Sequence, residues 1–537
     1  MLNSFTGSQS NYFTTGPYSL QSQDNFPYTE WTAQKVYYDE YRLWYTGEAL
    51  TETVLDTATG NRIDKYPIKI NPLKGTCAKH AAVLFGLTVD SMHLGGVPVS
   101  FAPAVDKEKR VRALEVAEVI HKILSKSNAG ATFITNGISS QYLGGCVFSA
   151  RWRPDLDENG RIEISIPSAD ELVAIPDGTD YTTLKEAWIV REISYIEARS
   201  YFPDIPKENT IFYYTEHWTP TEYEIAINGV TVQFNGVPAK GPNPFGVVPI
   251  VYIPHIRDRK MLGKSLITDA VKGLIKEMNL RFADIGDAVS DDSHSYVAAR
   301  NIAGNIKLTP LADGRKILDL GSGSGIGNGD NPDLFAVKAQ SASEPMLKFA
   351  EELDKYYRRE VDHPSVADGE DQGSQRSSLT LNTRMWPLVS HVELERSYWT
   401  IGLLSLAKII LKMCLIKGLD GITKDDLKTD FLVKWPPMLP RDREVLVNEI
   451  AIRSTHNMGT TQHLMGLFDD IDDPEEMWAA VLEEKKALSE IVTEQKTKEA
   501  EANAKDNPGG ETSNLDAKSG AKAPPSGQEK KPGKTTE

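Results

Sequence analysis

The stretch 263–289, GKSLITDAVKGLIKEMNLRFADIGDAV, repeats its apolar residues at gaps of three or four positions. This spacing puts them on one face of a helix about 40 Å long, at a rise of 1.5 Å per residue. The apolar face consists of Ile267, Val271, Leu274, Met278, Phe282, Ile285 and Val289. Basic side chains fall off that face, at Lys264, Lys272, Lys276 and Arg281. The stretch therefore predicts a long amphipathic helix that buries one side and leaves its cations outside.

A second helix is predicted over 343–361, SEPMLKFAEELDKYYRREV, with Ser343 as its N-terminal cap and Pro345 in its first turn. Between the two helices, residues 295–340 form short strand-like runs rich in glycine. Two long helices that bracket a small β-rich segment predict a stalk with a tip.

The rest of the chain changes from helices to strands and back. Helical patterns cover 28–47, which Gly47 closes, and 106–127. From about 130 to 255, alternating apolar and polar residues with Asn-Gly and Asp-Gly turns predict strands. A long helix is expected over 387–418, and further helices follow it. Helices and strands segregated in this way indicate an α+β fold.

The 537 residues carry a formal net charge of −16. This acidic balance argues against a protein whose whole surface binds nucleic acid, because such binding needs clustered Lys and Arg. It does not exclude DNA passing close to an acidic wall. Three cysteines without a CxxC pair or Cys/His spacing indicate neither a disulfide framework nor a zinc site, and they favour a reducing cytoplasm. The polar N-terminus lacks the basic flank and apolar core of a secretory signal.

One segment, 399–416, is long and apolar enough to be mistaken for a membrane span. Lys408 and Lys412 lie in its middle, and each would cost about 2.5 kcal/mol or more near the centre of a bilayer. A core helix with both lysines on its wet face is therefore expected, and no membrane partner. Residues 506–537 contain no aromatic, Ile, Val or Met residue, so we expect them to be disordered.

Residues 316–330, KILDLGSGSGIGNGD, have the spelling of a nucleotide-binding turn. A similar run opens the cofactor site of many S-adenosylmethionine-dependent methyltransferases, so an enzyme of this class that uses 321–325 is the alternative function. A cofactor turn needs a helix directly after it and an acid at the end of the next strand. The residues that follow, IGNGDNPDLF, are rich in helix breakers, and no such acid appears. A glycine loop in a small β subdomain is the favoured interpretation.

Two other local patterns resemble metal sites. DLDENGRIEI, from Asp155, begins like a calcium loop, but Ile166 stands where a bidentate Glu is needed, so an Asn-Gly hairpin turn is favoured. His391 and Glu395 lie four apart on one helix, and we expect a solvated or interface pair. The sequence has no phosphate-binding loop, GxSxG or HExxH motif. We therefore expect no catalytic residues, no cofactor, no metal and no enzymatic activity.

Three stretches together resemble bacteriophage portal proteins, the head–tail connectors of tailed phages. The first is GRIEISIPSADELVAIPDG at 160–178 with EAWIVREI at 186–193, which is similar to a strand pair of the portal wing. The second is the Pro-rich strand PFGVVPIVYIPHIRD at 244–258, followed by the helix opening at Gly263. The third, EDQGSQRSSLTLNTRMWPL at 370–388, stands where portals carry a tunnel loop before a long helix.

The resemblance implies an elongated α+β subunit of the portal type, assembled as a ring. It would have an α/β wing, a two-helix stem, a small β-rich clip, a long wing helix and a helical crown. By position these are a flexible arm at 1–27, the wing at 28–255, the first stem helix at 256–290, the clip at 291–340, the second stem helix at 341–363, the tunnel loop at 364–386, the long wing helix and its return at 387–434, the crown at 435–500 and a disordered tail at 501–537.

The resemblance also implies a structural function in the virion. A ring, usually of twelve subunits, would sit at one capsid vertex after assembly in the host cytoplasm, and double-stranded DNA would pass through it in packaging and ejection. Its partners would be the terminase large subunit, a tail adaptor, the major capsid protein and the scaffold.

Candidate residues follow from these positions. The candidates to face the DNA channel are Lys264, Lys272, Lys276 and Arg281 in the stem and Gln372, Ser374, Gln375 and Arg376 in the tunnel loop. For each lysine, an ordinary solvated face or a salt bridge between subunits stays open as the alternative. The candidate docking loop of the clip contains Gly321, Gly323, Gly325 and Asn328.

Overall fold

The computed structural model divides the chain into two units, Met1–Asp442 and Arg443–Glu537. It describes residues 26–505, apart from 56–59, 61, 67, 87–95, 106, 159, 179, 202, 204–210, 233–237, 259–262, 294–295, 301–316, 320–332, 338–342, 371–377, 440–442, 457 and 466–473. Among these residues, the first unit contains both helices and mostly antiparallel sheets, and the second unit is helical. This bears out the α+β fold.

The largest sheet of the first unit is antiparallel throughout and has the strand order β10-β9-β8-β7-β6, with β11 paired to β9. Its strands are β6 (Leu172–Asp177), β7 (Asp180–Ser194), β8 (Ile211–Trp218), β9 (Glu222–Ile227), β10 (Val230–Thr231) and β11 (Lys240–Pro242). On one face, Trp31 packs on Trp188 and Val190. The other face, which includes Tyr214 and Ile225, belongs to the main core.

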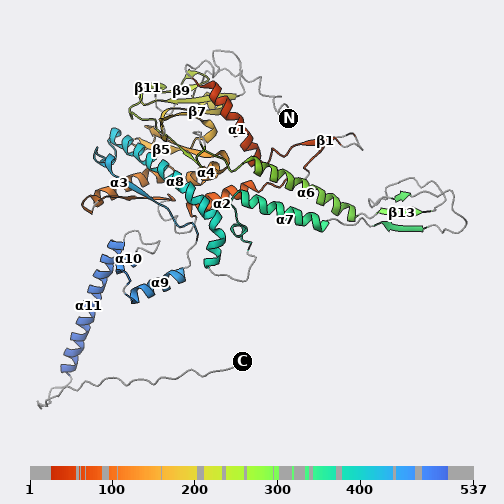
Figure 1. Cartoon of the computed structure of the whole chain (residues 1–537). Helices are drawn as coiled ribbons and strands as arrows, with labels where there is room; N and C mark the ends of the chain where they lie inside the picture. Colours follow the sequence, from red (N-terminus) through yellow and green to blue (C-terminus); the bar gives the residue numbers. More distant parts are fainter. Residues whose placement is uncertain are drawn as a thin grey trace, which may run out of the picture. The chain divides into compact units, whose positions relative to one another are not determined.

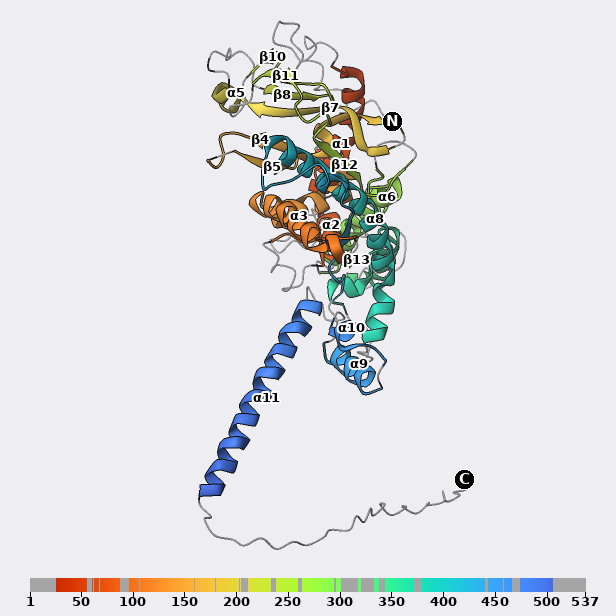
Figure 2. The same ribbon diagram turned by 90° about the vertical axis from the view of Figure 1, so that its left-hand side faces the viewer.

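A smaller antiparallel sheet lies under the large one as a second layer (Figure 2). Its order is β12-β4-β5, with β4 (Gly145–Arg153), β5 (Arg161–Ser165) and β12 (Ile250–Pro254). The hairpin between β4 and β5 confirms the turn predicted around Asp155, whose carboxylate pairs with Arg153.

Helices cover and support this layer (Figure 1). The long helix α8 packs on β12, β4 and α2, and its apolar residues enter a core with those of α3 and α4. The helices are α1 (Tyr28–Thr46), α2 (Leu73–Phe85), α3 (Lys107–Lys126), α4 (Ala129–Leu143), α5 (Tyr195–Tyr201) and α8 (Ser378–Lys417), with short 3₁₀ turns at Ala169–Glu171, Ser365–Asp368 and Asp426–Lys428. Two small antiparallel pairs are also present: β1 (Thr53–Leu55) with β2 (Arg62–Asp64), and β3 (Ser100–Pro103) with β16 (Phe431–Lys434).

Two helices, α6 (Asp269–Ser293) and α7 (Ser343–Glu360), pack side by side (Figure 1). We call this pair the stem. The chain between them contributes a three-stranded sheet of order β14-β13-β15, made of β13 (Tyr296–Arg300), β14 (Ile317–Asp319) and β15 (Asp333–Val337). Most of the predicted apolar stripe is buried, including Val271 and Met278, whereas Val289 is exposed. The helix, small sheet, helix order predicted from the sequence is therefore present.

The second unit contains α9 (Arg443–Thr455), α10 (Thr461–Met465) and α11 (Pro474–Lys505). Leu464 of α10 is buried, but α11 exposes several apolar side chains, among them Leu482, Leu488 and Ile491. This unit has little core of its own among the residues that the structure describes.

Two predicted helix ends are confirmed. Gly47 ends α1 with a φ of 87°, the left-handed conformation that glycine adopts at low cost, and its N–H donates to the carbonyl of Leu43. The helix predicted at 106–127 is α3.

The helix α8 is long and apolar enough to cross a membrane by length and composition alone. Its apolar residues Leu403, Ile410 and Met413 are fully buried in the core, as expected for 399–416.

Three boundaries were predicted wrongly. Residues 129–143 form α4, although strands were expected from about 130. The first stem helix begins at Asp269 and not near Gly263, because the main chain before it bonds to other segments: the Leu266 N–H donates to the Gln141 carbonyl. Thr268 Oγ1 then accepts from the Val271 N–H and caps the helix. Helix α8 starts at Ser378 and passes through Pro387, so the end of the stretch predicted as a loop is helical.

Candidate functional site

The four stem cations predicted to face DNA differ in their surroundings. Lys264 precedes α6 and is exposed. Among the residues that the structure describes, no carboxylate forms an ion pair with its ammonium group. Its main chain is fixed, because the Lys264 N–H donates to the Ile256 carbonyl at 2.8 Å. Of the four, Lys264 is the cation that remains open to an external anion.

Lys272 and Lys276 are paired within their own chain. Lys272 Nζ lies 2.6 Å from Glu40 Oε1, a residue of α1, and 3.3 Å from Asp269 Oδ1. Burial lowers the pKa of the Lys272 ammonium, but its bonds to these two carboxylates more than offset this, so that the pKa lies above its ordinary value. Lys276 Nζ lies 3.2 Å from Glu52 Oε1 and above the ring of Trp44.

Arg281 is likewise neutralised by its own helix. Its guanidinium lies 2.7 Å from the carboxylates of both Glu277 and Asp284, and it also stacks over the Phe349 ring of α7. Within one chain, Lys272 and Lys276 therefore connect α6 to Glu40 of α1 and to Glu52, and Arg281 pairs within α6. A cation already paired contributes less to phosphate binding, and a role of all four toward DNA stays a prediction.

The remaining predicted residues lie outside the described part of the chain. These are Gln372, Ser374, Gln375 and Arg376 of the tunnel loop and Gly321, Gly323, Gly325 and Asn328 of the glycine run. The strand before the glycines is described: β14 ends at Asp319 and pairs in parallel with β13, which pairs antiparallel with β15. A methyltransferase site needs alternating strands and helices around such a turn, and this three-stranded sheet does not favour that alternative.

The sequence interpretation missed a buried polar cluster around α8. It consists of His80, His255, His363, His391 and Glu395, and we call it the histidine hub. His391 and Glu395 were expected to be a solvated or interface pair, and this was wrong: their side chains are 8% and 0% exposed. The signal that could have found them is the spacing of apolar residues: Val392 and Trp399 lie three residues before and four residues after Glu395, on the same buried face of the helix.

Hydrogen bonds link the histidine hub to several elements. His255 Nε2 lies 3.1 Å from His391 Nε2, and His255 Nδ1 lies 2.9 Å from the carbonyl oxygen of Lys264. His391 Nδ1 lies 3.1 Å from Asp362 Oδ2. Glu395 accepts from Gln141 Nε2 at 2.8 Å, and also from the Ser140 hydroxyl and the Trp399 indole. No group of three or more possible ligands in the described chain is arranged to hold a metal ion.

Burial shifts the acidity of these groups. Burial raises the pKa of Glu395 to about 7, although its hydrogen bonds with Gln141 and Trp399 favour the charged form. Burial lowers the pKa of His255 to about 3 and that of His363 to about 4. The pKa of His80 is also lowered, by burial and then by His391. The hub therefore favours neutral imidazoles at His80, His255 and His363.

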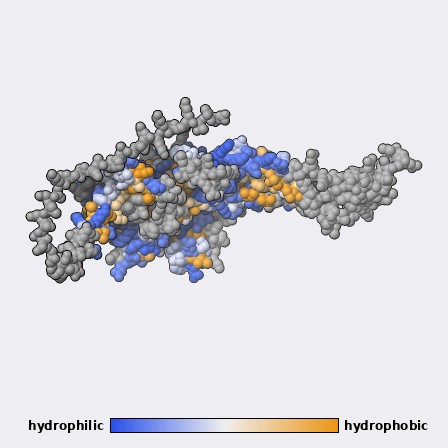
Figure 3. Space-filling model, turned by 90° about the horizontal axis from the view of Figure 1, so that it is seen from below, coloured by the Kyte–Doolittle hydropathy of each residue, from blue (hydrophilic) through white to orange (hydrophobic). Residues whose placement is uncertain are grey.

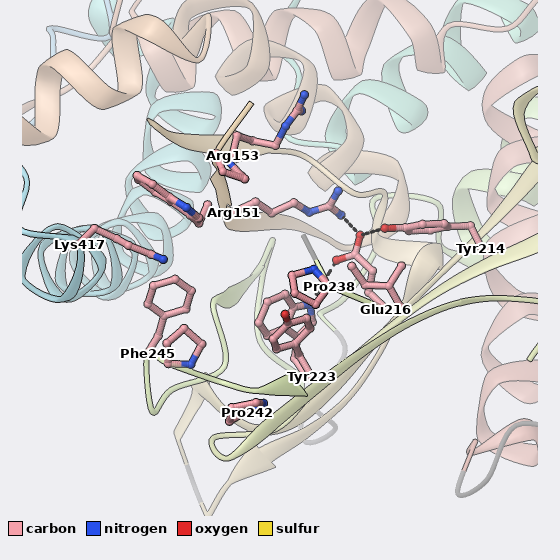
Figure 4. Close-up of a pocket in the computed structure, with 14 residues that line it drawn as sticks. Arg151, Arg153, Tyr214, Glu216, Tyr223, Pro238, Pro242, Phe245 and Lys417 are labelled. Carbon is pink, nitrogen blue, oxygen red and sulfur yellow. Dashed lines mark hydrogen bonds and ion pairs between the residues drawn. The ribbon is translucent and has the colours of Figure 1, made fainter. Parts of the chain in front are cut away.

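A second feature missed from the sequence is a cavity of about 310 Å³ between the two sheets and the end of α8 (Figure 4). Prolines and aromatic rings such as Tyr223 and Phe245 line it. Glu216 lies in its wall, where it pairs with Arg151 and accepts from the Tyr214 hydroxyl at 2.7 Å and from the Trp218 indole at 3.2 Å. These three donors hold the Glu216 carboxylate in a fixed position in the wall of the cavity.

Comparison with known protein families identifies the family of this chain. The family model of the phage portal proteins, SPP1 Gp6-like, matches residues 93–490. The chain therefore belongs to the phage portal proteins, the structural head–tail connectors of bacteriophage virions. Within them it belongs to the SPP1 Gp6-like family. The resemblance found in the three sequence stretches is thereby confirmed.

Similarity to solved structures is more distant. A solved structure described as the neck of an empty GTA particle, computed with C6 symmetry, contains a chain that is 12% identical, with a TM-score of 0.41. The match covers 79% of this chain and 98% of that one. No curated protein sequence matches this chain significantly.

Proposed function

We propose that this chain is the subunit of a ring at one capsid vertex, through which double-stranded DNA is packaged and ejected. The observation that carries the proposal is the family match over residues 93–490, which includes the stem, the small sheet between its helices and α8. In this proposal the subunit is structural. Its sheets and α8 form the wing, and the stem is attached to the wing.

Exposed apolar groups on the stem support assembly into a ring. Val289, Leu347, Phe349 and Tyr356 are each about half exposed, and Figure 3 shows apolar surface on this part of the molecule. Contiguous exposed apolar surface marks sites of association in soluble proteins. A closed ring lets every copy bury such surface against its neighbours, and we propose a ring of twelve copies.

The charges of the stem support a channel in which DNA slides. If every cation faced phosphates, each of them would add salt-dependent affinity and slow the duplex. The ion pairs of Lys272, Lys276 and Arg281 reduce that affinity. Lys264 and the tunnel-loop side chains, Arg376 among them, are the proposed phosphate contacts, and none of them reads bases.

The proposed partners follow from the same arrangement. The clip, 291–340, would dock the terminase large subunit during packaging and the tail adaptor afterwards, through the loop that contains Gly323. The wing and crown would contact the major capsid protein and the scaffold. The motor's ATP hydrolysis belongs to the terminase, because this sequence has no phosphate-binding loop. Assembly would take place in the host cytoplasm and the mature ring would lie in the virion.

Electron microscopy of labelled virions tests this role. A small affinity tag after Glu537 is decorated with gold in mildly opened phage particles. We expect gold at a single vertex per capsid, the one that carries the tail. The same tag on the major capsid protein is the control and decorates the whole shell. Gold spread over all vertices, or particles without the tagged chain, would contradict the proposed function.

A further inference from the structure

Aromatic rings form the walls of the cavity between the two sheets. On the side of the large sheet, the rings of Trp218 and Tyr223 lie 5.1 Å apart, with an angle of 23° between their planes. Figure 4 shows Phe245 and Lys417 on one side of the cavity and Tyr223 on the other. The volume of about 310 Å³ is at the lower end of the range of ligand cavities, about 300–1,000 Å³. The cavity therefore has room for one aromatic ring with a short side chain.

Prolines stiffen the wall and remove hydrogen-bond donors from it. Pro154, Pro238, Pro242 and Pro244 all line the cavity. A proline ring fixes the backbone φ at about −65° and leaves no N–H to donate. Because such a wall is already ordered, little conformational entropy is lost when a ligand enters. At these four positions the protein offers apolar contact and no main-chain donor.

The arginines of the cavity wall are neutralised by acids of the same unit. Arg151 pairs with Glu216, which is the one acid among the described residues that line the cavity. Arg153 lies 2.8 Å from the carboxylates of both Asp155 and Glu163. These pairs leave little net charge at either arginine or at Glu216. The charge preference of the cavity therefore depends on its remaining ionic side chain.

That side chain is Lys417, the last residue of α8. Its Nζ lies 4.7 Å from the centre of the Trp152 ring and 6.0 Å from that of the Phe245 ring, and no carboxylate of the described residues forms an ion pair with it. The faces of the two rings attract the ammonium group and hold it beside the cavity. There it remains open to an anion.

Tyr223 supplies a second polar group in the lining. Its side chain belongs to a residue that is 8% exposed, and no described residue forms a hydrogen bond with its hydroxyl. Burial raises the pKa of Tyr223, so the hydroxyl keeps its proton at neutral pH and can donate. The cavity therefore combines apolar walls with two available donors, the ammonium group of Lys417 and the hydroxyl of Tyr223.

We propose that this cavity binds a ligand in which a short linker joins an aromatic ring to a carboxylate. The ring packs on Trp218 and Tyr223, and the carboxylate pairs with Lys417. A carboxylate is the matching group because it only accepts hydrogen bonds and carries the charge opposite to that of the lysine. Two sources have this chemistry: a free aromatic acid, and the aromatic residue at the carboxyl end of a peptide. The site does not depend on ring assembly or on the passage of DNA.

Saturation-transfer NMR of the full-length protein measures the binding of 3-phenylpropionate and of its uncharged analogue 3-phenylpropanamide. We expect the acid to bind with a Kd of about 1 mM. The amide has the same ring without the charge and is expected to bind about threefold or more weakly. The peptide acetyl-Ala-Ala-Phe with a free carboxyl end distinguishes the sources. Binding tighter than that of the free acid identifies a chain end as the ligand, and binding no tighter identifies a free acid.

Two variants locate the binding in this cavity. Lys417→Gln changes an exposed residue, so the protein is expected to fold, and it is expected to bind the acid and the amide equally. Tyr223→Phe keeps the ring and is expected to weaken binding of the acid about twofold or more. The matched control is Lys408→Gln, at an exposed lysine of the same helix outside the lining, and it is expected to keep the preference for the acid.

Three results would each overturn the proposal. The first is that neither ligand binds the unmodified protein at concentrations up to about 20 mM. The second is that the acid and the amide bind the unmodified protein equally. The third is a preference for the acid that survives Lys417→Gln, because the charge would then be recognised at another site.

Discussion

At the scale of single residues, Gly137 shows how closely α4 approaches its neighbour α2. A Cβ atom at this position would lie 2.7 Å from Phe85 Cε2 and 3.3 Å from the Cβ of Ala81. Phe85 is fully buried against Phe133 and Trp399, so its ring has little room to move. Gly137 lowers the helix propensity of α4, but the absence of a side chain at this position lets α4 pack closely against α2.

We predict that Gly137→Ala lowers the free energy of unfolding. Overpacking costs about 1–3 kcal/mol, which outweighs the ~1 kcal/mol that alanine gains over glycine within a helix. The matched control is Gly273→Ala in α6, where no atom lies within 4 Å of the added Cβ and a small gain is expected. Urea unfolding followed by circular dichroism measures both. A Gly137→Ala protein as stable as the control would show that α2 and α4 are farther apart than described.

At the scale of elements, the sequence predicted those whose signal is local. The stripe from Val271 to Ile285 predicted α6 apart from its start, and the stop at Gly47 predicted the end of α1, because periodicity and capping act within a few residues. Helix α4 was missed because its Thr, Ile and Gly residues have low helix propensity and its helical state is decided by packing on α2 and β4. The histidine hub was missed for a similar reason: its members are brought together only by the fold.

The stem leads to a prediction about DNA binding by assembled rings. Lys264→Ala is expected to reduce the slope of log affinity against log salt by about 0.9 for each DNA phosphate that the ring no longer neutralises. Lys276→Ala is the matched change in a lysine that is already paired with Glu52, and it is expected to change the slope less. Binding of a short duplex, measured by fluorescence anisotropy at several salt concentrations, separates the two. Equal effects of the two variants would contradict the distinction between open and paired cations.

At the scale of the whole molecule, the central claim is that copies of this chain close into a ring. An acidic chain with a net charge of −16 associates only where apolar contact outweighs charge repulsion. The exposed apolar side chains of the stem, such as Leu347 and Phe349, offer such contact. Their position on the pair α6 and α7 is consistent with subunits that meet along the stem.

The most direct test is the mass of the purified full-length protein, measured by native mass spectrometry or mass photometry over a range of concentrations. A ring of twelve copies of 59.4 kDa predicts a species of roughly 700 kDa. A related closed ring of another copy number would keep the claim of a ring and change only its stoichiometry. A single species of 59.4 kDa at every concentration would contradict it.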